Sequence, residues 1–255
     1  PVTKVEVRGT YLRQTFDDAG CCGSAELLKL RAYELIQYDL VLALDMDALV
    51  LHPLEPLLRR AIAERRSLLY LPDPYLATPD AAAPPANGGW LLIRPSMRVF
   101  RELVEVVRGG DFRAGSGWGG SRIGWCWGGR TVQGLLPYYY AKRAPQTASE
   151  ALDRCVYNVM QDDGCEHVPF ERVQTVHFTH CQKPWSCQRL GNKRMCAAMT
   201  DAWWAARAAL ESASGVQPQR CVAGSYPRLA PSVISWLGSS RARGTARAAD
   251  AHDQA

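Results

Sequence analysis

Two acidic side chains stand inside an apolar stretch, YDLVLALDMDALVLHP, which covers residues 38–53. Asp45 and Asp47 are separated only by Met46, and leucine, valine and alanine surround them. A carboxylate in apolar surroundings is costly unless it has a partner. If the strand continues, both acids face one side; if it ends at Asp45, both lie at its carboxyl end, where α/β sheets bind ligands. In either case a divalent cation relieves their repulsion, and hard oxygen ligands suit Mg²⁺ or Mn²⁺.

The Asp-x-Asp spacing alone leaves three interpretations open. In the first, Asp45 ends a strand, Asp47 begins a turn, and neither binds a ligand. In the second, the chain is a phosphatase in which Asp45 attacks phosphorus, Asp47 serves as acid and base, and Asp162 and Asp163 form a later acidic pair. In the third, the chain is a nucleotide-sugar glycosyltransferase whose acid pair holds a metal that binds the diphosphate.

The elements expected around the acid pair alternate between helices and strands. Ser24 is a good N-cap for a helix that runs to about residue 37, and Ser96 for a helix through Val107. Further helices are expected over 53–65 and 197–213, and strands over 67–72, 90–95 and 173–178. Such alternation predicts an α/β domain. We expect one domain over residues 1–237 and a disordered tail over 238–255.

The segment 109–140 changes character, because glycine, tryptophan and tyrosine dominate it. This composition is typical of a sculpted pocket wall rather than of a regular helix or strand. Trp118, Trp125 and Trp127 are candidates both for stacking on sugar rings and for the core. The three tyrosines at 138–140 are expected to form a packed strand or a pocket wall.

Bulk composition excludes several function classes. The 255 residues are 47% hydrophobic and 22% charged, with a net charge of +5. This balance suits an anionic ligand but lacks the dense basic patch of a nucleic-acid binder. No run of about 18 apolar residues is present, so no transmembrane segment is expected within the sequence. Because the chain begins at Pro1 rather than Met, we expect a fragment or a processed form, whose membrane anchor or targeting peptide would lie outside it.

Nine cysteines are many for a cytosolic enzyme and favour disulfides in a secretory lumen. Those between residues 155 and 196 have no paired CxxC spacing, so a structural zinc site is not expected there. Cys181 and Cys187 flank Lys183 and are expected to fix its loop by disulfides. The odd count leaves at least one thiol free or paired to another chain. The expected location is the Golgi or secretory lumen, with the cytoplasm or a plastid as the alternative.

Four longer stretches carry a family resemblance. They are CCGSAELLKLRAYELIQYDLVLALDMDALVLHPLEPL, NGGWLLIRPSMRVFRELVEVVRGGDFRAGSGWGG, IGWCWGGRTVQGLLPYYY and VHFTHCQKPW. Together they resemble glycosyltransferase family 8, the glycogenin-like enzymes, and within it the plant and algal starch-initiation-like subgroup. The resemblance implies a GT-A fold with a mixed, mostly parallel sheet flanked by helices, here without the first strand and helix. It also implies retaining transfer of a hexose or related sugar from a UDP-sugar, with Mn²⁺, or else Mg²⁺, as cofactor.

The resemblance assigns roles to individual residues. It implies that the metal ligands are Asp45, Asp47 and His177, that the donor contacts are Lys29, Asp45, Met46, Asp47, Asn87, Gly88, Gln133 and Lys183, and that Gln133 and Lys183 are catalytic. The sequence departs from the pattern at Val132, where glycogenin-type members have an aspartate just before the glutamine. This departure removes a carboxylate from the neighbourhood of the sugar.

The expected mechanism is electrostatic. As the glycosidic bond breaks, charge develops on the leaving diphosphate, and a divalent cation and Lys183 stabilise it. Because no carboxylate nucleophile is evident near Gln133, front-face attack assisted by the leaving phosphate is favoured. The rival is a non-catalytic protein that keeps the scaffold and binds glycans or partners, which Val132 and the missing first element favour. The acceptor is a glycan, glycolipid or protein that the sequence does not specify.

Overall fold

The computed structural model describes residues 5–76, 81–145, 148–162, 164–187, 193–221 and 231–233. The chain forms two compact units, Pro1–Val159 with Arg172–His177, and Met160–Glu171 with Phe178–Ala255. The single domain over residues 1–237 stays a prediction. The tail expected over 238–255 lies outside the described residues.

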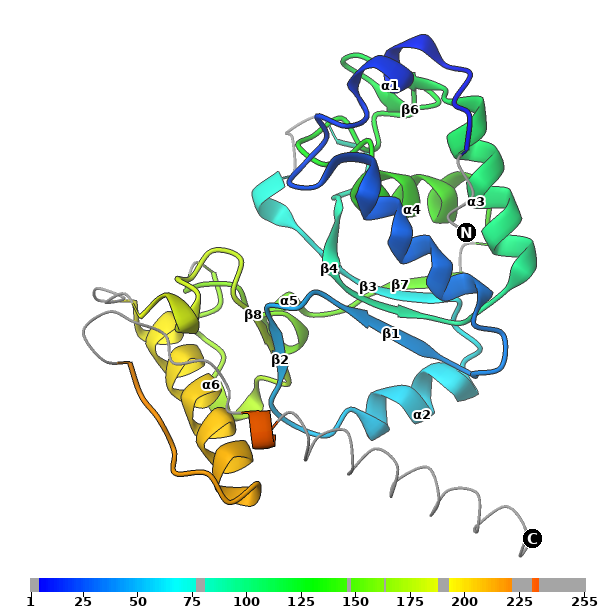
Figure 1. Cartoon of the computed structure of the whole chain (residues 1–255). Helices are drawn as coiled ribbons and strands as arrows, with labels where there is room; N and C mark the ends of the chain where they lie inside the picture. The colour runs from blue at the N-terminus through cyan, green and yellow to red at the C-terminus, as the bar shows by residue number, and fades with distance from the viewer. Residues whose placement is uncertain are drawn as a thin grey trace, which may run out of the picture. The chain divides into compact units, whose positions relative to one another are not determined.

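Helices and strands alternate along most of the chain (Figure 1). In chain order the described elements are α1 (Thr10–Thr15), η1 (Gly23–Glu34), β1 (Val41–Leu44), β2 (Ala48–Val50), α2 (Glu55–Ala63), β3 (Leu68–Pro72), η2 (Pro74–Leu76), β4 (Ala86–Ile93), α3 (Met97–Gly109), β5 (Phe112–Arg113), β6 (Gly117–Trp118), α4 (Val132–Lys142), β7 (Ser149–Ala151), α5 (Arg154–Tyr157), η4 (Phe170–Arg172), β8 (Thr175–His177), η5 (Pro184–Ser186) and α6 (Arg194–Ala213), where η marks a 3₁₀ helix. The apolar stretch with the two acids is therefore interrupted. β1 ends at Leu44 and β2 begins at Ala48, so Asp45 and Asp47 lie in the turn between two strands.

The main sheet of the first unit is mixed, with strand order β1-β4-β3-β7. β4 pairs antiparallel with β1 and with β3, whereas β3 pairs parallel with β7. Three of the four strands therefore run in one direction, and β4 is inserted between β1 and β3, which are linked through α2. This arrangement confirms the prediction of a mixed α/β sheet flanked by helices, although the insertion of β4 makes two of the three pairings antiparallel.

Helices cover both faces of the main sheet, with α2 on one side and η1, α3 and α4 on the other (Figure 1). Leu68 and Ile93 face the core that η1, α3 and α4 also line. Leu69 and Trp90 face the opposite core, which α2 also lines. A strand covered on both faces reads as a continuous apolar run rather than an alternating one. That explains the sequence WLLI within β4, which is buried along its whole length.

α3 begins where the sequence predicts. Ser96 is its N-cap, and the Ser96 hydroxyl oxygen accepts a hydrogen bond from the Val99 amide at 3.4 Å. Gly110 ends the helix in the left-handed conformation, with φ of 65°, a region that glycine enters without steric cost.

The helix expected from Ser24 is a 3₁₀ helix, η1, and Ser24 does not cap it. The Ser24 hydroxyl instead donates to the Asp17 carboxylate at 2.5 Å. Side chains three residues apart are eclipsed in a 3₁₀ helix. Glu26 and Lys29 therefore stand side by side on η1, which matters for the site described below.

The strand expected for the three tyrosines at 138–140 is wrong, because they lie on a helix, α4. The alternative, a pocket wall, stays a prediction. The whole stretch 132–140 is buried, so it is apolar on every side and has no helical period to read from the sequence. Pro137 inside the helix obscures it further, since proline lacks a backbone donor and disfavours helix interiors. The Tyr139 hydroxyl donates to Glu102 on α3, so at least this tyrosine serves packing.

The second unit contains α6 and two disulfides, Cys181–Cys196 and Cys187–Cys221. Both cysteines that flank Lys183 are thus disulfide-bonded, as predicted. Free thiols among the described residues are Cys21, Cys22 and Cys126. None of the helices in the described part of the chain is both long and apolar enough to cross a bilayer.

Candidate metal and donor site

The turn after β1 is held by backbone hydrogen bonds. The Asp45 amide donates to the Gly89 carbonyl on β4, and the Asp45 carbonyl accepts from the Ala48 amide, each at 3.0 Å. β2 then pairs with β8 so that Ala48 lies opposite His177. This register brings His177 next to Asp47, which it follows by 130 residues in the sequence.

Asp45, Asp47 and His177 offer ligand atoms that all lie within 4.8 Å of one another. His177 Nε2 lies 3.1 Å from Asp47 Oδ1 and 3.9 Å from Asp45 Oδ2. In an octahedral site with bonds of about 2.0–2.1 Å, ligand atoms lie about 2.9 Å apart when adjacent and about 4.1 Å apart when opposite. The observed separations fall between these limits. Two carboxylates and an imidazole therefore fit a Mg²⁺- or Mn²⁺-sized cation, and the imidazole favours Mn²⁺.

Burial increases from one side of this site to the other. The His177 side chain is 3% exposed, that of Asp47 20% and that of Asp45 34%. Met46, between the two acids, is fully exposed. A cation could reach the acids from solvent while the imidazole stays fixed in the protein. The predicted contact of Met46 with the donor remains a prediction.

Lys29 joins the acid pair from η1. Its Nζ lies 2.7 Å from Asp45 Oδ1 and 2.8 Å from Glu26 Oε2. Burial alone would lower the pKa of Lys29, but its hydrogen bonds to Asp45 and Glu26 outweigh burial and raise that pKa. Lys29 therefore stays charged at neutral pH and binds one oxygen of Asp45, while the other oxygen faces His177. Lys29 thus lies beside the acid pair, and its predicted contact with the donor stays a prediction.

Gly88 and Gly89 on β4 make room for these side chains, because neither glycine carries a Cβ atom. A Cβ atom at Gly89 would lie 2.3 Å from His177 Cε1 and 2.8 Å from Asp45 Oδ2. A Cβ atom at Gly88 would lie 3.3 Å from Glu26 Oε2 and 3.4 Å from Lys29 Nζ. His177, Asp45 and Lys29 thus pack directly against the backbone of β4 at these two glycines. The predicted contact of Gly88 with the donor stays a prediction, and Gly89 is a further residue against which the proposed ligands pack.

In this structure the Asn87 side chain is buried and hydrogen-bonded to other parts of the protein, so it is not exposed to a ligand. Its Nδ2 donates to Asp73 Oδ2 at 3.0 Å, and its Oδ1 accepts from the Gly89 amide at 3.0 Å. Both Asn87 and Asp73 are almost completely buried. Asn87 therefore fixes the backbone on which His177 and Asp45 rest, and its predicted contact with the donor sugar stays a prediction.

Replacing Asn87 with alanine is expected to lower the free energy of unfolding by about 1–3 kcal/mol, because Asp73 and the Gly89 amide each lose a buried partner. Chemical denaturation measures the change. Gln14→Ala removes an amide from an exposed position of α1 and should change stability by no more than about 0.5 kcal/mol. If the two variants were equally stable, Asn87 would have no such role.

Gln133 and Val132 begin α4 and face different neighbours. Gln133 is nearly buried, and its Oε1 would lie 2.2 Å from a Cβ atom placed on Gly128. Val132 Cγ2 would lie 3.4 Å from a Cβ atom on Gly88. Val132 is thus the residue that packs beside Gly88, whereas a role for Gln133 at the sugar stays a prediction.

Lys183 belongs to the second unit, where its Nζ donates to the Phe178 carbonyl. Its contact with a diphosphate stays a prediction. Asp162 of the same unit lies in a bend of intermediate burial, and its carboxylate caps α6 by accepting a hydrogen bond from the Met195 amide at 2.8 Å. Asp163 lies outside the described residues.

The three tryptophans of the glycine-rich segment divide into two groups. Trp118 is fully buried, and its indole nitrogen donates to the Gly129 carbonyl at 2.9 Å, so it belongs to the core. Trp125 and Trp127 are 38% and 57% exposed, respectively. Only these two retain the surface needed to stack on a sugar ring.

Sequence reasoning did not single out Glu26, Asp73 or Gly89 as site residues. Glu26 stands three residues before Lys29, and an acid–base pair at that spacing is a signal that could have been read. Asp73 had no such signal, because its partner comes from the far end of a loop. Gly89 could have been suspected from the paired glycines that precede the apolar run of β4.

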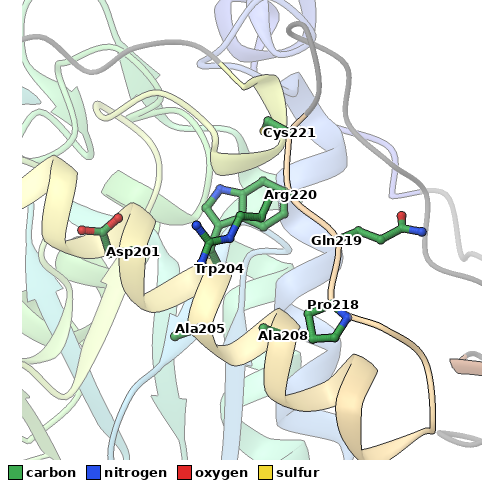
Figure 2. A pocket seen from close by; sticks show the side chains of 8 residues that line it. All are labelled: Asp201, Trp204, Ala205, Ala208, Pro218, Gln219, Arg220 and Cys221. Carbon is green, nitrogen blue, oxygen red and sulfur yellow. The ribbon is translucent and has the colours of Figure 1, made fainter.

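The second unit carries a separate pocket of about 510 Å³ between α6 and the segment that follows it (Figure 2). Trp204 on α6 and Arg220 on the later segment both line it. No residue assigned to the metal or donor site from the sequence lies in this pocket.

Comparisons with known proteins give a likeness in structure only. No protein-family model and no curated protein sequence matches the chain. A solved structure of the apo-form glycosyltransferase GlyE from Streptococcus pneumoniae TIGR4 is 17% identical over 76% of this chain and 47% of its own, with a TM-score of 0.47. The WbbM bifunctional glycosyltransferase, apo, is 14% identical over 69% of this chain and 37% of its own, with a TM-score of 0.42. The galactosyltransferase LgtC, in complex with donor and acceptor sugar analogues, is 17% identical over 69% of this chain and 65% of its own, with a TM-score of 0.39.

This chain thus spans between about one third and two thirds of the length of these structures. All three identities are under 20% and all three TM-scores are under 0.5.

Proposed function

We propose that this protein is a metal-dependent retaining glycosyltransferase of the GT-A type, related to family 8, that transfers a hexose or related sugar from a UDP-sugar. The observation that carries the proposal is the convergence of Asp45, Asp47 and His177 at the end of β1, with Lys29 bound to the first acid. A divalent cation held there supplies a Lewis acid for the charge that develops on the leaving diphosphate.

In this proposal the two carboxylate oxygens of Asp45 have different partners. Oδ1 is bound by Lys29, and Oδ2 faces the imidazole of His177. Lys29 thereby fixes the rotation of the carboxylate, and Glu26 in turn fixes Lys29. A preorganised ligand needs no rearrangement when the cation and the diphosphate arrive.

The backbone of β4 supports the proposed metal site. Gly88 and Gly89 present no side chain there, so His177, Asp45 and Lys29 can pack directly against the strand. Glu26 lies beside Gly88, as does the apolar Val132. Glycogenin-type members have an aspartate at the position of Val132. We infer that the Glu26 carboxylate, which also lies beside Gly88, takes the place of that missing aspartate carboxylate. Gln133 and Lys183 complete the proposed donor contacts, and attack from the front face remains our proposal for retention.

The phosphatase alternative is less well supported. Its acidic pair would include Asp162, but one oxygen of Asp162 is used to cap α6. Lys29 also binds an oxygen of Asp45, the residue that would attack phosphorus. The non-catalytic alternative keeps the fold and predicts no response to metal and donor together.

A thermal-melting experiment tests the proposal. The chain is heated with Mn²⁺, with each member of a panel of UDP-sugars, and with both together. A ligand at a concentration 100 times its Kd stabilises the folded state by about 2.7 kcal/mol. We expect a large shift only when Mn²⁺ and one UDP-sugar are both present, and that sugar is the donor. If a UDP-sugar gave the same shift without metal, or if no combination gave a shift, the proposal would be wrong.

We further propose that the protein acts in the Golgi or secretory lumen on a glycan, glycolipid or protein acceptor. The two disulfides of the second unit support an oxidising compartment.

A further inference from the structure

Two adjacent thiols and a carboxylate form a second cluster in the first unit, apart from the proposed metal site. Cys21 and Cys22 are exposed free thiols, and the Glu26 side chain is 10% exposed. One ligand atom from each of the three lies within 4.8 Å of the other two. We propose that Cys21, Cys22 and Glu26 bind a thiophilic divalent cation of the Zn²⁺ class, with solvent as the fourth ligand. This site does not depend on the proposed glycosyl transfer for its argument, but it shares Glu26 with the proposed donor site, because the other carboxylate oxygen of Glu26 binds Lys29.

The distances match a tetrahedral zinc site. With Zn–S bonds of about 2.3 Å and Zn–O bonds of about 2.0 Å, tetrahedral geometry places sulfur and oxygen ligands about 3.5 Å apart. Cys21 Sγ lies 3.5 Å from Glu26 Oε1. The same geometry places two sulfur ligands about 3.8 Å apart, a separation that lies within the 4.8 Å limit observed for the ligand atoms of this cluster.

Glu26 is aimed at the thiols by its other contact. Lys29 holds Oε2 at 2.8 Å, which leaves Oε1 directed toward Cys21. Burial, the Cys22 thiol and the Glu26 carboxylate together raise the pKa of Cys21 to about 12. A thiol must lose its proton to bind the cation, so binding at this site releases protons to solvent and weakens as the pH falls. The bound cation then neutralises the negative charge that these three groups accumulate.

A disulfide between the two cysteines fits less well. Consecutive Cα atoms are about 3.8 Å apart across a trans peptide, whereas disulfides usually span about 4.4–6.8 Å between Cα atoms. An adjacent pair is therefore strained when oxidised and better suited to share a metal. Thiolates select soft and borderline metals, whereas the two carboxylates and imidazole of the other site suit harder ones.

Titration with Cd²⁺ tests the proposal, because a sulfur-to-cadmium charge-transfer band in the ultraviolet reports only thiolate ligands. The full chain, with its disulfides intact, should develop this band with one equivalent of Cd²⁺, and Zn²⁺ should displace it. Cys21→Ser and Cys22→Ser should each weaken the band, and the double variant should lose it. Cys126→Ser, which removes the other free thiol among the described residues, should keep it. A band that survives the double variant would overturn the proposal.

A second measurement needs no variant. Zn²⁺ should protect Cys21 and Cys22 of the unaltered chain from alkylation, as read by mass spectrometry, while Cys126 reacts at an unchanged rate. Equal alkylation of Cys21 and Cys22 with and without Zn²⁺ would contradict the proposal even if the serine variants failed to fold.

Discussion

Replacing Asp47 with asparagine is expected to lower the affinity for Mn²⁺ by about 100-fold or more and to abolish sugar transfer. Asparagine keeps one oxygen near His177 but loses the charge that offsets that of the cation. Mutation of outer-shell partners of a metal already costs roughly 10–100-fold in affinity, so the loss of a direct ligand should cost at least as much. Titration of Mn²⁺, followed by the paramagnetic signal of the free ion, measures the affinity.

Asp39→Asn is the matched control, because Asp39 is exposed and precedes β1 outside the site. It removes the same charge from the same segment of the chain and should leave Mn²⁺ binding unchanged. If both variants bound Mn²⁺ like the parent protein, Asp47 would not be a ligand. If both lost affinity equally, general electrostatic attraction would explain the binding.

Gly89→Ala is expected to have the second large effect, a loss of metal binding together with lower stability. Its Cβ atom would overlap the imidazole of His177 and crowd Asp45 Oδ2, at 2.3 and 2.8 Å. Overpacking of a buried position typically costs about 1–3 kcal/mol. The imidazole is enclosed, with 3% exposure, so it can move only by disturbing β8. Melting temperature and Mn²⁺ titration report the two losses separately.

Gly88→Ala provides the comparison within the same strand. Its Cβ atom would meet the ends of Glu26, Lys29 and Val132 at 3.3–3.4 Å, which small side-chain movements relieve. Neither glycine has the positive φ that alanine resists, so backbone strain does not separate the two variants. We expect Gly88→Ala to keep most Mn²⁺ affinity. Equal losses in both variants would show that the packing described around His177 is wrong.

The elements that follow local rules could be predicted from the sequence. β3 and β4 were visible as apolar runs, and Ser96 was recognised as the cap of α3. Asp45 and Asp47 indicated a functional site because charged residues rarely interrupt an apolar run. Their position after β1 rather than within one long strand was an open alternative, which the pairing of β2 with β8 decides.

The residues that meet through long-range pairing could not be derived in the same way. His177 reaches Asp47 only because β8 pairs with β2, and no local pattern reports that register. The sequence named His177 through a family resemblance instead. α4 was missed because it is buried on every side and contains Pro137. Glu26 was missed although its spacing of three residues from Lys29 makes the two side chains neighbours on a helix of either kind.

The central claim is that the Asp45–Asp47–His177 cluster holds a cation that binds the diphosphate of the donor. Pulsed electron paramagnetic resonance of the Mn²⁺ complex with UDP tests it most directly, because couplings to ¹⁴N and ³¹P identify the atoms bound to the metal. We predict an imidazole nitrogen coupling and a phosphorus coupling in the same complex, and loss of the nitrogen coupling in His177→Gln. Bound Mn²⁺ with a phosphorus coupling but no nitrogen coupling, or with a nitrogen coupling that survives in His177→Gln, would contradict the account.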